Sequence, residues 1–255
     1  MKVTLLTHTP DPEKLVATAA KLCYSESDVD HLQENLTDEK VESFLNMLMN
    51  IGHESPIEHA SFTFAIEGIS RACSHQLVRH RIASYSQKSQ RYVNEAQFEY
   101  VTPPIIEDNL TLKDLYTNTM EIVHARYNLL RTELIEKFMK DGMDKKSAEK
   151  KANEDARFVL PNACCTSIIV TMNIRSLFNF FNHRCCNRAQ WEIRAVAEEM
   201  YKLCVSVAPT IFKHTGPSCV VKGKCPEGKM SCGKMHKMKD KYAYFIETSE
   251  NSSNV

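Results

Sequence analysis

The feature that most limits the fold of this chain is a pair of segments in which every second residue lies on the same face. Each of these segments is followed by a segment with a helical pattern. In segments 61–66 and 164–172 this period of two is typical of half-buried strands. Segment 70–78 contains no Pro or Gly and reads as a helix, and 173–184 has helical spacing. The residues that share a strand face are Phe62, Phe64 and Ile66, and then Cys164, Thr166, Ile168, Val170 and Met172. We expect an α+β fold in which an antiparallel or mixed sheet is flanked by long helices.

The other segments fit the same fold class. The sequence predicts strands over 2–7 and 97–102. It predicts helices after Pro12, after a capping Asp38, and over 108–140, 145–157 and 191–207. Gly68 is expected to end the strand that begins at 61. The Ser- and Gln-rich composition after Arg81 favours a loop.

Composition bounds the class of protein. A chain of 255 residues with 43% hydrophobic and 25% charged residues can bury a sizeable core. Lys plus Arg equals Asp plus Glu at 32 each, so no global charge attracts nucleic acid or an anionic membrane. No apolar run approaches the roughly 20 residues of a membrane span, and the start lacks a leader-like apolar region. We expect a cytoplasmic protein whose ten cysteines are reduced thiols.

Segment 79–92 concentrates hydrogen-bond donors. It holds three arginines, a lysine, a histidine, three serines and two glutamines in fourteen residues. Arginine offers planar, permanently charged donors, and serine hydroxyls with backbone N–H groups can close around phosphate oxygens. The segment therefore predicts a local anion site, with a solvated basic loop as the structural alternative.

Two further segments carry polar residues that need an explanation. His53 and His59 flank a proline and do not have the four-residue spacing of a helical H-E-x-x-H zinc site, so a polar turn is expected. In 173–184, asparagines and arginines line a helix edge where exposed surfaces usually carry Glu and Lys. Arg157, at a helix end, is favoured there by the helix dipole alone.

Together these segments resemble the flavin-dependent thymidylate synthases. Segment 79–92 matches the pattern R-H-R-x7-S-x-R, and segment 52–59 resembles G-H-E-[ST]-x-x-E-H. Segment 154–161 resembles E-x-A-R-x-x-L-P, and 173–184 resembles N-x-R-S-L-x-N-F-x-x-x-R, followed by A-Q-W-E-I at 189–193. The resemblance covers roughly residues 1–212.

The resemblance implies an activity and its cofactors. It implies reductive methylation of deoxyuridine monophosphate (dUMP) to thymidylate with FAD as cofactor, methylenetetrahydrofolate as carbon donor and NADPH as reductant. It also implies the fold of that family and a homotetramer with sites shared between subunits. A cysteine nucleophile is not expected, because the sole neighbouring Pro and Cys are Cys225-Pro226, in the wrong order and in the tail.

The resemblance also assigns residues by position. Arg184 is the candidate catalytic residue, facing the pyrimidine. The expected dUMP-binding residues are Gln76, Arg79, Gln87, Lys88, Ser89, Gln90, Arg91, Arg157 and Arg184. The expected FAD-binding residues are His53, Ser55, Arg79, His80, Arg81, Gln87, Asn173, Arg175 and Asn179. Two positions depart from some family members: Ser86-Gln87 replaces an Asn-Glu pair, and Arg188 replaces a histidine.

The remaining segment, 213–255, is rich in Lys and Cys and reads as a C-terminal extension to a domain over 1–212. Cys219, Cys225, Cys232 and His236 have the residue types of a zinc site, but their gaps are not the C-x2-C of common ribbons. We expect a flexible or surface-packed extension and no bound metal.

Two other functions stay open on the sequence alone. One is a nucleic-acid-binding module that grips phosphates with the Arg-His-Arg loop and stacks bases on Tyr85 and Tyr92. The other is a flavoprotein without turnover. Neither a Rossmann G-x-G-x-x-G nor a Walker motif occurs, so flavin binding rests on the resemblance.

Overall fold

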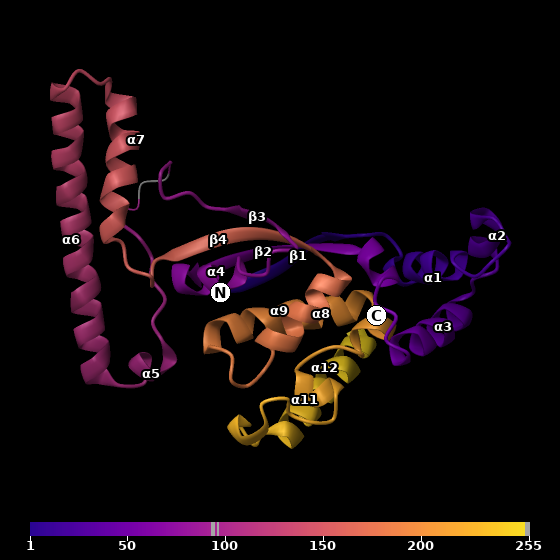
Figure 1. The fold of residues 1–255 in the computed structure, drawn as a ribbon. Coiled ribbons are helices and arrows are strands. Elements are labelled where there is room, and N and C mark those ends of the chain that lie inside the picture. The colour runs from indigo at the N-terminus through magenta and orange to yellow at the C-terminus, as the bar shows by residue number, and fades with distance from the viewer. Residues whose placement is uncertain (93–94, 96, 253–255) are drawn as a thin grey trace. The chain divides into compact units, whose positions relative to one another are not determined.

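The computed structural model describes residues 1–92, 95 and 97–252 (Figure 1). Its four strands form one antiparallel sheet in the order β1-β2-β4-β3. The strands are β1 Lys2–His8, β2 Ser61–Ser70, β3 Ser84–Gln87 and β4 Cys165–Asn173. The α-helices are α1 Pro12–Leu22, α2 Val29–Glu34, α3 Asp38–Asn50, α4 Arg71–Leu77, α5 Pro104–Glu107, α6 Leu110–Lys140, α7 Lys145–Ala156, α8 Ile174–Arg184, α9 Trp191–Val207, α10 Pro209–Phe212, α11 Ser218–Val221 and α12 Met235–Ser252. Short 3-10 turns are η1 Pro56–His59, η2 Arg157–Val159 and η3 Gly228–Met230.

The α+β class and the alternating strands are confirmed. In β2 and β4 every second side chain is buried, from Phe62 to Ile66 and from Thr166 to Met172. The prediction that Gly68 ends β2 is wrong, because the strand continues to Ser70. Gly68 has a φ of 67°, which lets the strand distort locally without ending. The cap prediction for α3 is also wrong, since Thr37 accepts the Lys40 N–H and Asp38 is the first helical residue.

Two predictions around the anion-site segment are corrected. The residues after Arg81 were expected to be a loop, yet 84–87 form β3, in which Tyr85 supplies a strand-favouring aromatic side chain. Segment 97–102 was predicted as a short strand, but it forms only an isolated β-bridge, between Tyr100 and Cys164. The N–H of Phe98 instead donates to Nε2 of His124 at 3.0 Å.

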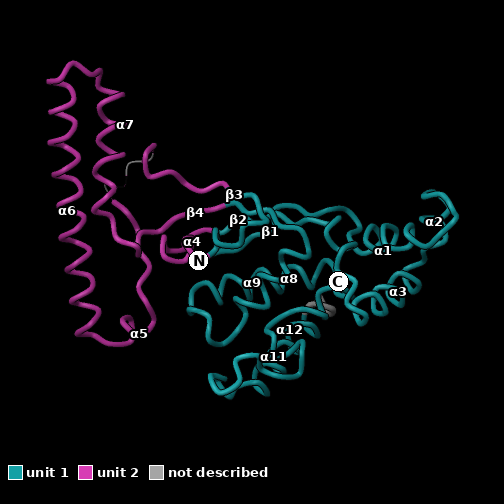
Figure 2. The backbone as a smooth tube through the Cα atoms, viewed as in Figure 1, with its two compact units in different colours: residues 1–66, 77–85, 169–255 teal, residues 67–76, 86–168 magenta. Residues whose placement is uncertain are grey.

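The chain divides into two compact units (Figure 2). Unit 1 comprises residues 1–66, 77–85 and 169–255, and unit 2 comprises 67–76 and 86–168. Segment 213–252 belongs to unit 1. Among the described helices, none has both the length and the apolar character needed to cross a bilayer.

The core of unit 1 is a chain of aromatic rings that fixes α8 against its neighbours. Phe181 of α8 meets Tyr201 of α9 at 5.5 Å between ring centroids, and meets Phe212 of α10 at 6.1 Å. Phe62 of β2 contacts the same Phe212 ring at 5.4 Å. Phe180 is fully buried, whereas Phe178 is half-buried. One face of α8 is thus anchored in apolar packing, which leaves the other face available for polar residues.

The extension is packed on the surface of unit 1. Tyr242 of α12 is buried and lies 4.9 Å from the ring of Tyr201 of α9. Lys241 donates to Glu198 of α9 at 2.6 Å. Helix α12 therefore docks on α9 through contacts of Tyr201 with Tyr242 and Phe245 and through one ion pair, which corresponds to the second of the two expected arrangements, flexible or surface-packed.

Unit 2 is built on the antiparallel pair α6 and α7. Phe138 packs with Ala148 and Ala152, whose small side chains let the helices approach. Nε of Arg131 donates to Oδ1 of Asn153 at 2.6 Å. The pair ends at Arg157, which occupies the C-cap position of α7.

Candidate active site

Helix α8 places the asparagine and arginine row of the sequence on one edge. Asn173 caps the helix, with Oδ1 accepting the N–H of Ser176 at 2.8 Å. Arg175, Asn179 and His183 follow at intervals of four residues and are exposed, and Nδ1 of His183 is 2.7 Å from the carbonyl oxygen of Asn179. Because Leu177 and Phe181 are buried on the opposite edge, this row faces away from the core.

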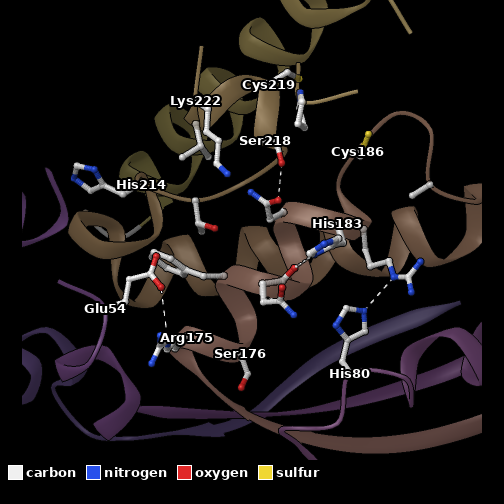
Figure 3. Close-up of a pocket in the computed structure, with 18 of the residues that line it drawn as sticks. Glu54, His80, Arg175, Ser176, His183, Cys186, His214, Ser218, Cys219 and Lys222 are labelled. Atoms are coloured by element: carbon white, nitrogen blue, oxygen red, sulfur yellow. Dashed lines mark hydrogen bonds and ion pairs between the residues drawn. The ribbon is translucent and has the colours of Figure 1, made fainter. Parts of the chain in front are cut away.

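This row forms one wall of a pocket of about 1590 Å³ that lies entirely within unit 1 (Figure 3). Its other walls come from four separated segments: 49–58, 79–82, 186–189 and the stretch from 214 to 238. In Figure 3, Arg175 and Glu54 lie on one side, His80 and His183 lie on another, and the extension residues Ser218, Cys219 and Lys222 lie opposite them. The pocket is larger than the roughly 300–1,000 Å³ that a drug-sized ligand occupies.

His80 and Arg184 form a hydrogen-bonded pair in this pocket. Nε of Arg184 donates to Nε2 of His80 at 3.1 Å, so that nitrogen carries no proton. The imidazole also stands edge-on to Phe180 at 4.9 Å between ring centroids. Burial, followed by the positive charge of Arg184 and by His183, lowers the pKa of His80 to about 4. His80 therefore stays neutral near pH 7 and fixes the direction of the Arg184 guanidinium.

The His80 pKa gives a prediction for pH dependence. Between pH 6.5 and 4 the unfolded chain protonates this imidazole while the folded chain does not, so His80 lowers stability as the pH falls through that window. We expect an NMR titration of His80 to give a pKa of about 4. In Arg184→Ala the pKa should rise but stay below 6.5, because burial is the larger cause. A value near 6.5 in the unmodified protein would contradict the arrangement.

Arg175 is held by two carboxylates, one in the loop before η1 and one within η1. Its Nε lies 3.5 Å from Oε2 of Glu54, and its Nη1 donates to Glu58. All three side chains are half exposed, so the pairs position Arg175 more than they stabilise the fold. Segment 52–59 thus contributes both of its glutamates to the pocket wall.

Arg79 and Arg81 have no hydrogen-bond or ion-pair partner within residues 1–92, 95 and 97–252, and both are exposed in the pocket. A guanidinium group without a carboxylate partner is free to bind an oxyanion with parallel N–H bonds. Of the residues predicted for FAD, the pocket brings together Arg79, His80, Arg81, Asn173, Arg175 and Asn179. His53, Ser55 and Gln87 are not among its lining residues, and their roles stay predictions.

Most residues predicted for dUMP belong to unit 2: Gln76, Gln87, Lys88, Ser89, Gln90, Arg91 and Arg157. Arg79 and Arg184 belong to unit 1. Nη2 of Arg91 is 3.0 Å from Oε2 of Glu154. The guanidinium of Arg91 also lies over the ring of Tyr92. Two of the three glutamine amides are hydrogen-bonded within the protein: Gln87 donates to Ser74 at 2.9 Å, and Gln90 donates to Cys164.

Two residues of unit 2 escaped the sequence reasoning. Arg71 opens α4, and Nη1 reaches the carbonyl oxygen of Lys88 at 3.5 Å. Burial lowers the pKa of Arg71, and the nearby charge of Arg157 lowers it further. Glu95 is buried, and burial raises its pKa while Lys88 and Arg71 lower it. Lys88, Arg71, Arg91 and Arg157 thus bring four positive charges to this segment of unit 2, together with the carboxylates of Glu95 and Glu154. Arg71 and Glu95 belong to no recognisable motif, so the sequence alone did not indicate a role for them.

Comparison with known proteins decides between the possible readings. Residues 4–210 match the family model described as "Thymidylate synthase complementing protein". A flavin-dependent thymidylate synthase of Clostridium tetani is 58% identical over 242 residues, which cover 95% of this chain and 97% of the relative. The chain belongs to the flavin-dependent thymidylate synthase family. Proteins of the same name from Geobacter sulfurreducens and Sulfurisphaera tokodaii are 52% and 40% identical, covering 94% and 87% of this chain and 97% and 80% of the relatives.

Within the flavin-dependent thymidylate synthase family, the likeness extends past residue 212. An alignment of 242 residues is longer than segment 1–212, so the Clostridium tetani relative must also match part of the extension. Part of the extension therefore also occurs in that relative. The nucleic-acid-binding reading finds no support in the names of these relatives.

Proposed function

We propose that this protein is an FAD-dependent thymidylate synthase that methylates dUMP to thymidylate, with methylenetetrahydrofolate as carbon donor and NADPH as reductant. Family membership supports the activity, as the chain matches named synthases over most of its length. The observation that carries the proposal is the pocket of unit 1, which Arg79, Arg81 and the polar row of α8 all line.

The residues present fit FAD. A dinucleotide with two phosphates needs a large cavity, cationic donors and polar groups for its ring edges. The pocket of about 1590 Å³ supplies the first, and Arg79 and Arg81 supply the second. Asn173, Arg175 and Asn179 offer the third along one helix edge. We assign the phosphates to the guanidinium groups of Arg79 and Arg81 for this reason.

Bound FAD would supply the hydride that the methylation requires. The chain's own contribution is to orient and polarise the pyrimidine, and Arg184 is the residue we assign to that task. A guanidinium aimed at a carbonyl stabilises the negative charge that develops there during the reaction. Neutral His80 accepts one Arg184 N–H, and so leaves the terminal nitrogens of the fork available to the substrate.

The cations of unit 2 are assigned to the nucleotide phosphate. Lys88, Arg91 and Arg157 are at least partly exposed, and Ser89 follows Lys88 with a hydroxyl that accepts the Arg91 N–H at 3.2 Å. Because the guanidinium of Arg91 forms an ion pair with Glu154, a bound phosphate must compete with that carboxylate for Arg91. We further propose a cytoplasmic homotetramer with sites shared between subunits, which the family resemblance supports.

The visible absorbance spectrum of the purified protein tests this function. We expect it to take up FAD, and the flavin bands should shift when dUMP is added. Arg81→Ala should bind FAD about 10-fold or more weakly, because a lost charged hydrogen bond costs about 1.5–3 kcal/mol. Arg126→Ala, a change at an exposed arginine of α6 outside both sets, is the matched control. A protein that takes up no FAD would overturn the proposal, and unchanged affinity in Arg81→Ala would remove Arg81 from its assigned role.

A further inference from the structure

The extension side of the unit 1 pocket carries a positive charge that the FAD and dUMP assignments do not use. Among the residues that the structure describes, six Arg or Lys side chains and three Glu side chains line this pocket. All three glutamates form ion pairs, two with Arg175 and one with Arg188. The proposed function assigns two other arginines to the FAD phosphates and Arg184 to the pyrimidine. Lys222 is the described lining cation that has neither a carboxylate partner nor an assigned ligand.

Lys222 stands at the end of α11, one turn after Ser218. Its N–H donates to the carbonyl oxygen of Ser218 at 2.9 Å, so the two side chains lie on the same face of the turn. Figure 3 shows both side chains directed toward α8. Within residues 1–92, 95 and 97–252, the ammonium group of Lys222 has no hydrogen-bond or ion-pair partner. Its three N–H donors are therefore available to an anion in the pocket.

Two further donors lie close to Ser218. Thr215 lines the pocket and is only 4% exposed, yet its hydroxyl has no hydrogen-bond partner in the part of the chain that the structure describes. A polar group in a buried residue usually has a partner, so this hydroxyl points to a ligand. Asn182 of α8 also lines the pocket, and its Oδ1 accepts the hydroxyl of Ser218 at 2.5 Å. That bond fixes the amide and leaves its Nδ2 group to donate.

Segment 214–222, which carries most of these donors, is held in one position. Gly216 has a φ of 134°, and a Cβ added there would lie 3.2 Å from Cδ1 of Tyr242. The backbone of the segment thus lies directly against the buried Tyr242 ring of α12. Nε2 of His214 donates to Oδ1 of Asn46 of α3 at 3.1 Å. Donors that are already in place lose little freedom when a ligand binds, which favours tight binding.

We propose that Lys222, Thr215 and Asn182 bind a phosphate monoester, namely the 2′-phosphate that distinguishes NADPH from NADH. This inference rests on the proposed function, in which NADPH is the reductant. A phosphate monoester has three strong acceptor oxygens and carries about −1.5 to −2 charge at pH 7, which suits one ammonium group and two neutral donors. Lysine binds phosphate as a point charge, whereas a carboxylate is more often held by the parallel N–H groups of an arginine.

The other phosphate monoester among the substrates belongs to dUMP. Its phosphate is assigned to the cations of unit 2, so we assign the extension side of the unit 1 pocket to the reductant. The volume of about 1590 Å³ exceeds the roughly 300–1,000 Å³ of one drug-sized ligand, so a second ligand fits beside FAD. NADPH has to bind beside FAD because it passes a hydride to it: NADPH, FAD and one proton give NADP⁺ and reduced FAD.

Binding of 2′,5′-ADP, the part of NADPH that carries the 2′-phosphate, tests the proposal. Calorimetric titration of the full chain, before and after FAD is added, should give an affinity about 10-fold or more above that for 5′-AMP, which lacks this phosphate. Lys222→Ala should remove most of the difference. Thr215→Val keeps the shape of the side chain without its hydroxyl, and should weaken 2′,5′-ADP binding roughly 2- to 10-fold. Lys224→Ala, at an exposed lysine that does not line the pocket, is the matched control.

Reduction of bound flavin without oxygen gives a second readout. Lys222→Ala should lower the second-order rate constant for NADPH about 10-fold or more and leave that for NADH unchanged.

Three results would overturn the proposal. The first is equal affinity of the unmodified protein for 2′,5′-ADP and 5′-AMP, and the second is loss of 2′,5′-ADP binding once FAD is bound, since the donors would then belong to the FAD site. The third is a Lys222→Ala variant that binds dUMP more weakly and 2′,5′-ADP normally. A chain that takes up no FAD but binds 2′,5′-ADP through Lys222 would support this site and overturn the flavin-dependent function.

Discussion

Replacing Arg184 with alanine is expected to lower kcat by about 10²–10³-fold, which is the usual cost of removing one donor that stabilises developing charge. The side chain enters the pocket from the last turn of α8, and its Nε is already held by Nε2 of His80 at 3.1 Å. A guanidinium held in place needs little reorganisation when charge develops on the pyrimidine. The assay is thymidylate formation with saturating dUMP, folate and NADPH, so that a loss in kcat is separated from a loss in binding.

The variant should remain folded, because Arg184 is half-buried and forms no ion pair among the described residues. Circular dichroism and the flavin spectrum check this point. Arg184→Lys keeps the charge but loses the planar fork, so it should recover little of the lost rate. Arg126→Ala, on exposed α6 surface, should have normal kcat. Full activity in Arg184→Ala would remove the residue from its catalytic assignment.

The sequence predicted the polar row of α8 because its physical cause is local. Residues four apart share a helix face, and the buried Leu177 and Phe181 fix which face is polar. The same reasoning predicted β2 and β4, whose alternation is also local. Where a single residue changes the backbone, as Gly68 does in β2, a local pattern gave the wrong strand end.

The pocket was less accessible to prediction because its walls are far apart in sequence. Residues from 49 to 238 contribute, and the contacts between them depend on how the aromatic rings of the core pack. The extension was expected to be flexible or surface-packed, and nothing in its composition revealed that Ser218 and Lys222 face the α8 row. The His80–Arg184 bond joins residues 104 positions apart, so no motif spacing reports it.

Phe181→Ala is expected to lower the free energy of unfolding by about 3–5 kcal/mol, the usual cost of removing a large buried ring and leaving a cavity. Phe181 is 0% exposed, and its ring contacts Phe180, Tyr201 and Phe212. Urea denaturation at one fixed protein concentration measures the change, because association in an oligomer would make the midpoint concentration-dependent. Tyr24→Ala is the control, since that ring is 80% exposed and its loss should cost within about 0.5 kcal/mol. Equal midpoints in the two variants would contradict the core assignment.

The same substitution links the core to the site. Phe181 and Phe180 hold the buried edge of α8, while Arg175, Asn179 and Arg184 project from the rest of the helix. A cavity beneath α8 lets the helix shift, and a displacement of about 1 Å in a positioning element can cost about 10²-fold in rate. At a temperature where Phe181→Ala is still folded, we therefore expect weaker FAD binding and lower kcat, although the substituted residue touches neither ligand. An unchanged FAD affinity in the folded variant would mean that α8 keeps its position without this ring, and that its remaining neighbours suffice to place the polar row.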